Sequence, residues 1–305
     1  MDRSSRRARA RAVRLAVTGV LAGILVALVP PAASVGLSAS ACRVANARTG
    51  TVKTTFTAAV DAANAGDTLT VRGTCQAGIE LGKDLTIRGT KPKGAGTPTL
   101  RGVIGFLADA RSVLVIPDTV NVTLASITLT GGGGTAGFPP DVYGGGLIVR
   151  GRATLMSVKV VGNDLSAGNG YGGGIEIDRG DVVIGGRSVI GQNSARWGAG
   201  IAVDQGGTLE IRDKAVVSGN IATEDGGGIY AVSAAVTISG SAKIKQNVAA
   251  GSGGGIYAED SQLRVRDRAS VTANAADDPG AAGGGIKVAA GTWAVIRDSA
   301  IVSGN

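Results

Sequence analysis

A sequence repeat of about 27 residues occurs six times in the second half of this chain. Each copy opens with a glycine-rich triplet and an aliphatic residue, and closes on an asparagine three positions after a β-branched residue. The aliphatic residues recur at intervals of 26 to 30 and are Leu147, Ile175, Ile201, Ile229, Ile256 and Ile286. The asparagines are Asn163, Asn193, Asn220, Asn247, Asn274 and Asn305. Self-similarity at this period indicates a repeat architecture and constrains the fold more than any local pattern does.

The length of the repeat limits which repeat architectures the chain can form. One copy has no stretch long enough for the crossover helix of a βαβ unit, and it is too short for a four-stranded propeller blade. It fits one coil of a parallel β-helix, in which each strand pairs with its equivalent about 4.8 Å along the axis. The inward residues predicted for one coil are Ile201, Leu209, Ile211 and Val217, and their matches in another coil are Ile256, Leu263, Val265 and Val271.

The glycines and asparagines have structural roles in such a coil. A glycine triplet suits a tight corner, where a positive φ or close backbone packing excludes a side chain. The column of asparagines can form an amide ladder, in which each side chain bonds its copy in the next coil. We therefore predict an all-β fold, a right-handed parallel β-helix, with handedness from the usual chirality of parallel crossovers.

The N-terminal segment reads as a signal peptide over residues 1–41. A basic stretch of 14 residues precedes an apolar run, and the small residues Ala39 and Ala41 stand just before Cys42. The apolar run is shorter than the ~20 residues that span a bilayer. An uncleaved signal anchor is the alternative, and the only membrane contact expected is through this segment. We expect a secreted or cell-surface protein.

Two further regions follow. Residues 42–66 are expected to be an N-terminal cap, with a short helix over 54–65 that Thr54 or Thr55 begins. Residues 67–305 are expected to form the parallel β-helix, with regular coils from about residue 143. Before that point the strand-like segments are spaced irregularly, at 68–73, 84–89, 112–117 and 121–132.

The net charge of +8 does not indicate a nucleic-acid partner. Residues 1–14 hold six arginines and one aspartate, a local charge of +5. The remainder has 25 basic and 22 acidic residues, which is about +3. The basic character thus belongs to the targeting segment.

Cys42 and Cys75 are the only cysteines. An even count in an exported protein favours a disulfide, which here would tie the mature N-terminus to an early strand. Two free thiols are the alternative.

The repeats resemble those of polymorphic outer membrane proteins, in which a GGA-aliphatic element pairs with FxxN. The resemblance covers roughly residues 143–305, with a third glycine in place of alanine and valine or isoleucine in place of phenylalanine. The segment that leads into the first strands resembles the start of secreted right-handed parallel β-helix proteins of the pectate-lyase-like class. Its sequence is "AAVDAANAGDTLTVRG", followed by "DLTIRG". The resemblance implies the fold, but that fold carries lyases, hydrolases, epimerases, tailspikes and adhesins.

The chain has no histidine, which excludes histidine-based triads, metal sites and general bases. A column three residues after the corner aliphatics holds Arg150, Asp178 and Asp204. Two aspartates on adjacent coils could share a proton or a calcium ion, although solvated strand ends are the commoner reading of such residues. We expect no metal or other cofactor, with calcium as the alternative.

Most of the aromatic residues gather at one corner. Three stand immediately before the corner glycines of consecutive coils, namely Tyr143, Tyr171 and Trp197. Two more, Tyr230 and Tyr257, follow the corner aliphatics of adjacent coils and would point outward. Aromatic faces beside carboxylates and an arginine would suit a sugar-binding groove. Alternatively, the stacked rings only stabilise the sheet, as cross-strand pairs do.

From these residues we expect non-enzymatic binding of a polymer, namely a polysaccharide, or adhesion to a cell-surface protein. The alternatives are a calcium-dependent enzyme resembling polysaccharide lyases and a purely structural stalk. Asn305 closes a repeat, so the last coil would present an unpaired edge and could support end-to-end association.

Overall fold

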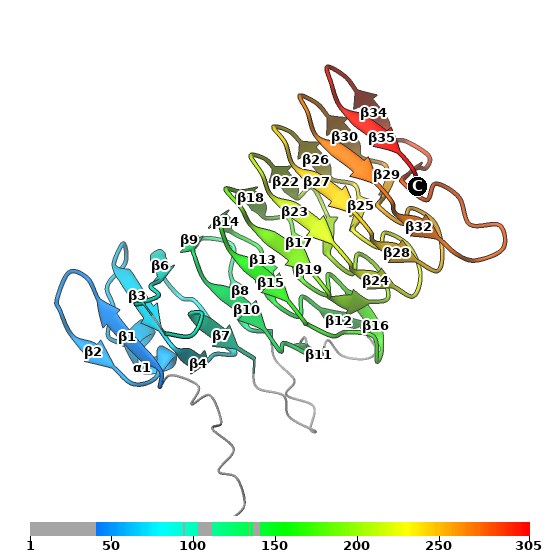
Figure 1. Ribbon diagram of the computed structural model, residues 1–305. Coiled ribbons are helices and arrows are strands. Elements are labelled where there is room, and N and C mark those ends of the chain that lie inside the picture. The colour runs from blue at the N-terminus through cyan, green and yellow to red at the C-terminus, as the bar shows by residue number, and fades with distance from the viewer. Residues whose placement is uncertain (1–40, 94, 103–111, 134, 137–140) are drawn as a thin grey trace, which may run out of the picture. The chain divides into compact units, whose positions relative to one another are not determined.

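The computed structural model describes residues 41–305, except for 94, 103–111, 134 and 137–140. Residues 1–40 of the segment predicted as a signal peptide therefore lie outside the described residues. Within them the chain winds as successive coils, and equivalent strands of neighbouring coils lie side by side (Figure 1). The prediction of an all-β parallel β-helix is confirmed, with about eight turns.

Three long sheets make up the walls of the coil. Sheet A runs in the order β2 (Val52–Lys53), β1 (Arg43–Asn46), β3 (Thr68–Arg72), β6 (Leu85–Gly89), β9 (Asn121–Ala125), β14 (Arg152–Met156), β18 (Asp181–Gly185), β22 (Thr208–Ile211), β26 (Ala235–Ile238), β30 (Gln262–Val265) and β34 (Trp293–Ile296). Sheet B runs in the order β4 (Thr74–Gln76), β7 (Thr99–Arg101), β10 (Thr128–Thr130), β15 (Lys159–Val161), β19 (Val189–Gly191), β23 (Val216–Ser218), β27 (Lys243–Lys245), β31 (Ser270–Thr272) and β35 (Ile301–Ser303). Sheet C runs in the order β5 (Ile79–Glu80), β8 (Leu114–Ile116), β13 (Leu147–Val149), β17 (Ile175–Asp178), β21 (Ile201–Asp204), β25 (Ile229–Val232), β29 (Ile256–Glu259) and β33 (Ile286–Val288).

From β11 onward, strands of two short sheets lie between sheets B and C in the chain order. Sheet D contains β11 (Thr135–Ala136), β12 (Asp141–Tyr143) and β16 (Asn169–Tyr171), and sheet E contains β20 (Ser194–Ala195), β24 (Ile221–Ala222), β28 (Val248–Ala249) and β32 (Ala275–Ala276). The described pairings are parallel except β1 with β2 and β3, and β11 with β12. The early strands β3 to β9 join the same sheets as the regular coils, although their spacing in the sequence is uneven.

The core follows the alternation of the strands. The eight residues predicted to point inward in two coils are at most 2% exposed. They belong to one continuous hydrophobic cluster that extends from Val44 to Val271. Burying one such aliphatic side chain stabilises a fold by about 1.5–3 kcal/mol.

The corner glycines are required by both conformation and space. Gly172 has a φ of +64°, which side chains rarely adopt. A methyl group on Gly174 would lie 2.5 Å from the carbonyl oxygen of Gly200 in the next coil. Coils can therefore approach this closely only where the corner lacks side chains.

The asparagine column forms a continuous ladder from Asn163 to Asn305. Each side-chain amide donates to the side-chain oxygen of the next asparagine at 2.8–3.0 Å. The backbone N–H of each donates to the same oxygen at 3.0–3.1 Å. Three of the six asparagines in the ladder are fully buried, namely Asn193, Asn220 and Asn247. The ladder thus satisfies polar groups that would otherwise be buried without partners.

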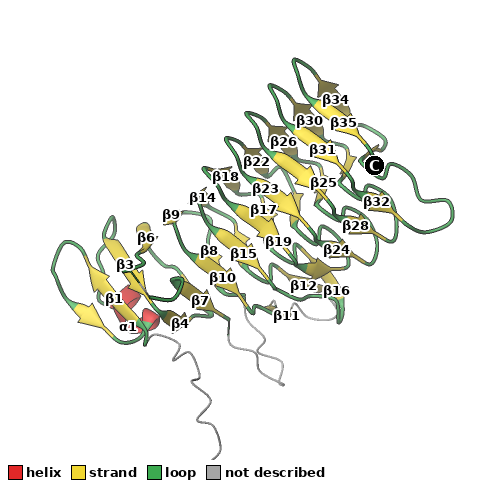
Figure 2. Ribbon diagram, viewed as in Figure 1, coloured by secondary structure: helices red, strands yellow, loops and turns green. Residues whose placement is uncertain are grey.

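A short helix stands at the N-terminal end of the described chain (Figure 2). It is α1 (Phe56–Asp61), and the hydroxyl of Thr55 accepts a hydrogen bond from the backbone of Ala58 at 3.3 Å. Phe56, Ala59 and Val60 are buried in the core. The role of this helix as a cap stays a prediction. At six residues it is the longest described helix, so none is long and apolar enough to cross a bilayer.

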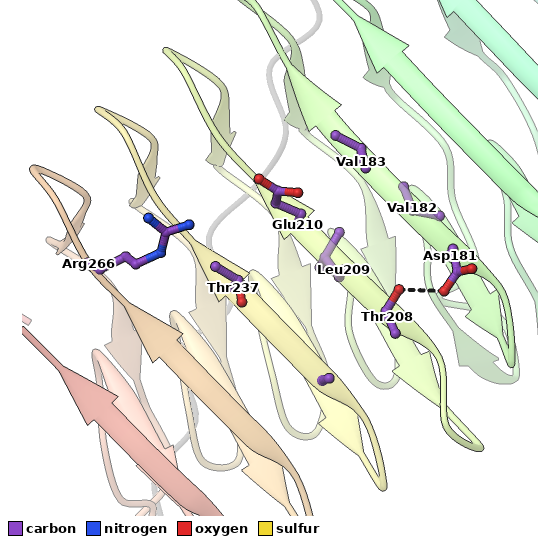
Figure 3. Close-up of a pocket in the computed structure, with 9 residues that line it drawn as sticks. Asp181, Val182, Val183, Thr208, Leu209, Glu210, Thr237 and Arg266 are labelled. Atoms are coloured by element: carbon purple, nitrogen blue, oxygen red, sulfur yellow. Dashed lines mark hydrogen bonds between the residues drawn. The ribbon is translucent and has the colours of Figure 1, made fainter.

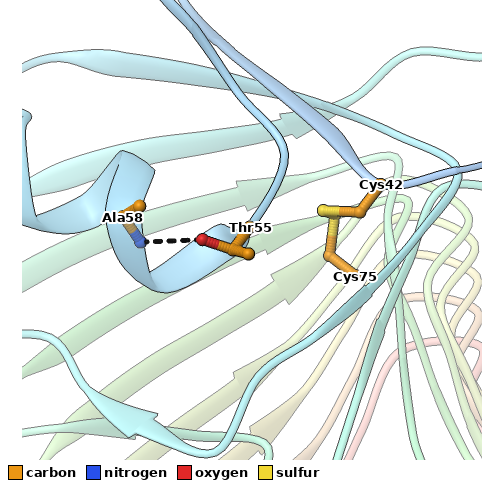
Figure 4. The surroundings of a disulfide bond; sticks show 4 residues. All are labelled: Cys42, Thr55, Ala58 and Cys75. Carbon is orange, nitrogen blue, oxygen red and sulfur yellow. Dashed lines mark hydrogen bonds between the residues drawn. A yellow bond between two sulfur atoms is a disulfide. The ribbon is translucent and has the colours of Figure 1, made fainter.

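Cys42 and Cys75 form a disulfide that joins the segment before β1 to β4 (Figure 4). The two cysteines are 33 residues apart in the sequence, and Cys75 is fully buried.

Reduction of this disulfide should lower the free energy of unfolding by about 3–4 kcal/mol, because the open chain regains the entropy of a loop of that length. Urea unfolding with and without reductant measures the difference. The variant in which both cysteines are replaced by serine is the control and should not respond to reductant. An unchanged midpoint for the reduced wild type would contradict the expectation.

The last described coil exposes apolar side chains on its strands. They are Val288, Trp293, Ile296, Ile301 and Val302. End-to-end association through this edge stays a prediction.

Candidate functional site

The residues singled out in the sequence lie along one side of the coil. Tyr143 pairs with Tyr171 in sheet D, and a β-bridge joins Tyr171 to Trp197. Asp178 and Asp204 are directly paired at the ends of β17 and β21. The corner loops and the ends of sheet C thus bring the predicted aromatic and charged side chains to one region.

Tyr143, Tyr171 and Trp197 form a stack, which we call the aromatic stack. Ring centroids are 5.7 Å apart between the two tyrosines and 4.6 Å apart between Tyr171 and Trp197, with interplanar angles of 17° and 20°. The guanidinium of Arg196 lies 4.2 Å from the centre of the Trp197 ring. The faces of the Tyr171 ring are therefore occupied by its neighbours in the stack.

The other two aromatic residues extend the same cluster. Tyr230 and Tyr257 stack at 5.2 Å, and Tyr230 lies 6.3 Å from Tyr171 at an angle of 57°. The hydroxyl of Tyr257 donates to Glu259 at 2.9 Å. Burial and the Glu259 carboxylate raise the pKa of Tyr257 to about 12, and burial likewise raises the pKa of Tyr230. Both phenols thus stay neutral and bond as hydroxyls at physiological pH.

Glu176 is the residue that the sequence analysis did not identify. It stands between the inward-pointing Ile175 and Ile177 of β17, so it points outward, yet it is fully buried. A methyl group on Gly172 would lie 2.7 Å from its Oε2, which shows that the corner loop covers the carboxyl group. Neither carboxyl oxygen has a hydrogen-bond partner. An ionised carboxylate without partners is very costly to bury.

Burial accordingly raises the pKa of Glu176 well above its usual range, and the nearby Asp204 and Asp178 raise it further. Arg150 acts in the opposite direction but more weakly. Glu176 is thus held as a neutral acid in the folded protein.

Asp178 is balanced by two arginines. Arg150 donates to its Oδ2 and Arg179 to its Oδ1, both at 3.0 Å. Burial alone would raise the pKa of Asp178, but the hydrogen bonds from Arg179 and Arg150 together outweigh burial and lower it. Asp178 is therefore the ionised member of the group.

Asp204 is balanced only weakly, because a hydrogen bond from Gln205 and the charge of Arg179 lower its pKa less than its surroundings raise it. Its Oδ1 is buried and has no hydrogen-bond partner. Burial, followed by repulsion from Asp178, raises its pKa to about 6. Asp204 is thus a partly buried residue beside two other carboxyl groups and not a fully solvated strand end.

These groups line one hollow, which we call the carboxylate pocket. Its volume is about 180 Å³, and its lining is Tyr143, Ile148, Arg150, Glu176, Asp178, Asp204 and Gln205. Within the described part of the chain, no group of three or more aspartate, glutamate or cysteine side chains is arranged to hold a metal ion. The calcium alternative gains no support from these residues.

A larger hollow of about 310 Å³ lies on the outer face of sheet A (Figure 3). It is lined by side chains that include Asp181, Thr208, Glu210, Thr237 and Arg266. The hydroxyl of Thr208 donates to Asp181 at 2.6 Å, and no unpartnered buried atom of the described residues lies here. The carboxylate pocket therefore remains the better candidate for a binding site.

Comparison with protein-family models, with curated proteins and with solved structures found no match to this chain.

Proposed function

We propose that this chain is an exported, secreted or cell-surface β-helix that binds a polysaccharide without cleaving it. The observation that carries the proposal is the carboxylate pocket, where Glu176, Asp178, Asp204 and Arg150 meet beside the ring of Tyr143. Charged acceptors and donors of this kind make strong hydrogen bonds to sugar hydroxyls. A ring at the wall supplies an apolar surface for the C–H face of a sugar.

The arrangement of the coil supports a polymeric ligand over a small one. The pocket holds only about 180 Å³, which is less than the volume of a typical drug-sized site. Beyond the pocket, the partly buried Tyr230 and Tyr257 follow on two successive coils in the same outward column as Glu176, with Ala202 between them and Glu176. One unit of a polymer can fill the pocket while its neighbours follow the sheet.

Binding is favoured over lyase-type catalysis by the state of the basic groups. A lyase-like enzyme needs a base that is free to remove a proton. Both arginines beside the pocket pair with Asp178. The resemblance of the repeats to those of polymorphic outer membrane proteins also supports a surface role.

A structural stalk or an adhesin for a cell-surface protein is the second candidate. It is favoured by Tyr171, whose two ring faces are covered by its neighbours. Such a stack stabilises neighbouring coils whether or not a ligand is present.

Affinity electrophoresis through gels that contain neutral or acidic polysaccharides tests the proposal. At least one polymer should retard the wild type, and Tyr143→Ala should weaken the interaction about tenfold, which corresponds to a loss of about 1.4 kcal/mol. Thr237→Ala, in the sheet A hollow, is the control and should migrate as the wild type does. Retardation by no polymer would refute polysaccharide binding and favour the stalk. Equal retardation of Tyr143→Ala would remove the pocket as the site.

A further inference from the structure

The carboxylate pocket has an imbalance of charge that a ligand could correct. Of its three acidic side chains, only Asp178 pairs with cations, and it pairs with two. The described ion pairs include neither Glu176 nor Asp204. Three oxygens of these two residues are buried without any hydrogen-bond donor. Glu176 and the Oδ1 of Asp204 therefore lack hydrogen-bond donors, and neither residue has a paired cation.

A neutral hydroxyl would supply only part of what is missing. It can donate a hydrogen bond to Asp204, but it leaves the mutual repulsion of the acidic groups unchanged. A cation next to Asp204 would make a charge-assisted bond and would also reduce that repulsion. An organic cation carried on a polymer fits the proposed polysaccharide ligand, so we take the cation to be organic.

A primary ammonium group matches the pocket in size and chemistry. It is a compact charge with three donors, and the hollow of about 180 Å³ is large enough for one sugar-sized unit that carries it. Tyr143 forms part of the wall, and a cation can also be attracted by the face of a tyrosine ring.

We propose that the carboxylate pocket receives the primary ammonium group of an amino-sugar unit, so that the polymer bound is a hexosamine glycan with free amines. This inference rests on the proposed polysaccharide binding and names its substrate class. The ammonium bonds to Asp204, which reaches the pocket surface. Glu176 lies behind that surface and is neutral in the free protein, so it acts on the ligand only through the charge that it gains when the bound cation favours loss of its proton.

Binding is then coupled to protons. Before binding, burial and the neighbouring aspartates hold protons on Glu176 and, below about pH 6, on Asp204. The incoming cation stabilises the ionised forms, so protons are released. The charged and titratable groups that face the site are Asp178, Arg150, Arg179 and Tyr143. Affinity should rise as pH increases from about 4.5 to 6.5, and fall again where the amine itself loses its proton.

Calorimetry with two hexosamine oligomers of equal length, one with free amines and one fully N-acetylated, tests the inference. At about pH 6.5 the free-amine oligomer should bind at least tenfold more tightly. At about pH 4.5 this preference should shrink severalfold, because the carboxyl groups are then protonated. Measurement in two buffers of different ionisation enthalpy should show net proton release.

Two isosteric variants separate the roles of the acids. Asp204→Asn should remove most of the preference for the free amine and leave the affinity for the acetylated oligomer within twofold. Glu176→Gln should reduce the number of protons released on binding. Glu80→Gln, at an exposed position on β5, is the matched control and should change neither value.

The outcomes distinguish this inference from the proposed function. Equal or tighter binding of the acetylated oligomer would overturn the ammonium site and leave polysaccharide binding intact. Binding of a lysine-containing peptide, with no binding of either oligomer, would overturn the amino sugar as the ligand. If polysaccharides retard the protein but Asp204→Asn keeps the full preference for amines, the ammonium does not lie in this pocket.

Discussion

Replacement of Asn220 with alanine should lower the free energy of unfolding by about 4 kcal/mol or more. Its side-chain oxygen accepts from the backbone and the side chain of Asn193 at 3.1 and 3.0 Å. Its amide donates to Asn247 at 2.9 Å and to the carbonyl of Ile190 at 3.1 Å. Each lost bond leaves a buried partner unsatisfied, at a cost of about 1–3 kcal/mol. Urea unfolding measures the total.

Asn305→Ala is the matched control for this variant. Asn305 belongs to the same ladder, but its side chain is exposed, so water can replace the lost bonds. We expect a loss of less than about 1 kcal/mol. A similar loss in both variants would mean that burial does not determine the strength of the ladder. No loss at Asn220 would mean that the ladder follows from the fold and does not stabilise it.

The second large effect is a dependence of stability on pH that originates at Glu176. The folded protein holds a proton on this residue at pH values where the unfolded chain has released it. Stability is therefore fully present below the ordinary pKa of glutamate and is lost as pH rises through the raised folded pKa. One such group contributes a slope of about 1.4 kcal/mol per pH unit in that window.

Glu176→Gln should remove this slope, because glutamine is neutral in both states. The variant should resemble the wild type in stability near pH 4 and exceed it at pH 8, as measured by unfolding across that range. Asp204, with a pKa of about 6, adds a similar loss at the acidic end of the window, which Asp204→Asn should remove. Glu80→Gln, an exposed control, should leave the curve unchanged. Equal slopes in wild type and Glu176→Gln would mean that Glu176 is ionised in the folded protein.

The fold could be predicted because its determinants repeat in the sequence. Strand alternation identified Leu209 and Ile211 as inward, and the structure buries both. The asparagines stood at equivalent positions in every copy, so their ladder required no knowledge of the loops. The uneven early segments join the same sheets, since loops of different length can connect strands that still pair in register.

The candidate site was predictable only in part. The pairing of Asp178 with Asp204 followed from their equal distance to the corner. Alternation along β17 is consistent with an outward Glu176, but alternation cannot say what covers an outward residue. That depends on the corner loop, where Gly172 lies against the carboxyl group. For the same reason, the sequence placed Tyr171 in a column with Tyr143 and Trp197, but it did not show that both faces of the Tyr171 ring are covered.

The equal length of three consecutive coils has a consequence for how the chain can be edited. The ladder steps from Asn193 to Asn220, Asn247 and Asn274 are each 27 residues long. Excision of one such unit between Asn220 and Asn247 would join two surfaces that already match in register and hydrogen bonding. The carboxylate pocket lies before that cut, with its carboxyl groups at residues 176 to 204, whereas Tyr230 would be removed with the excised unit. The number of coils and the chemistry of the pocket are therefore separable properties of this protein, and its length can be tuned without redesigning the carboxylate pocket.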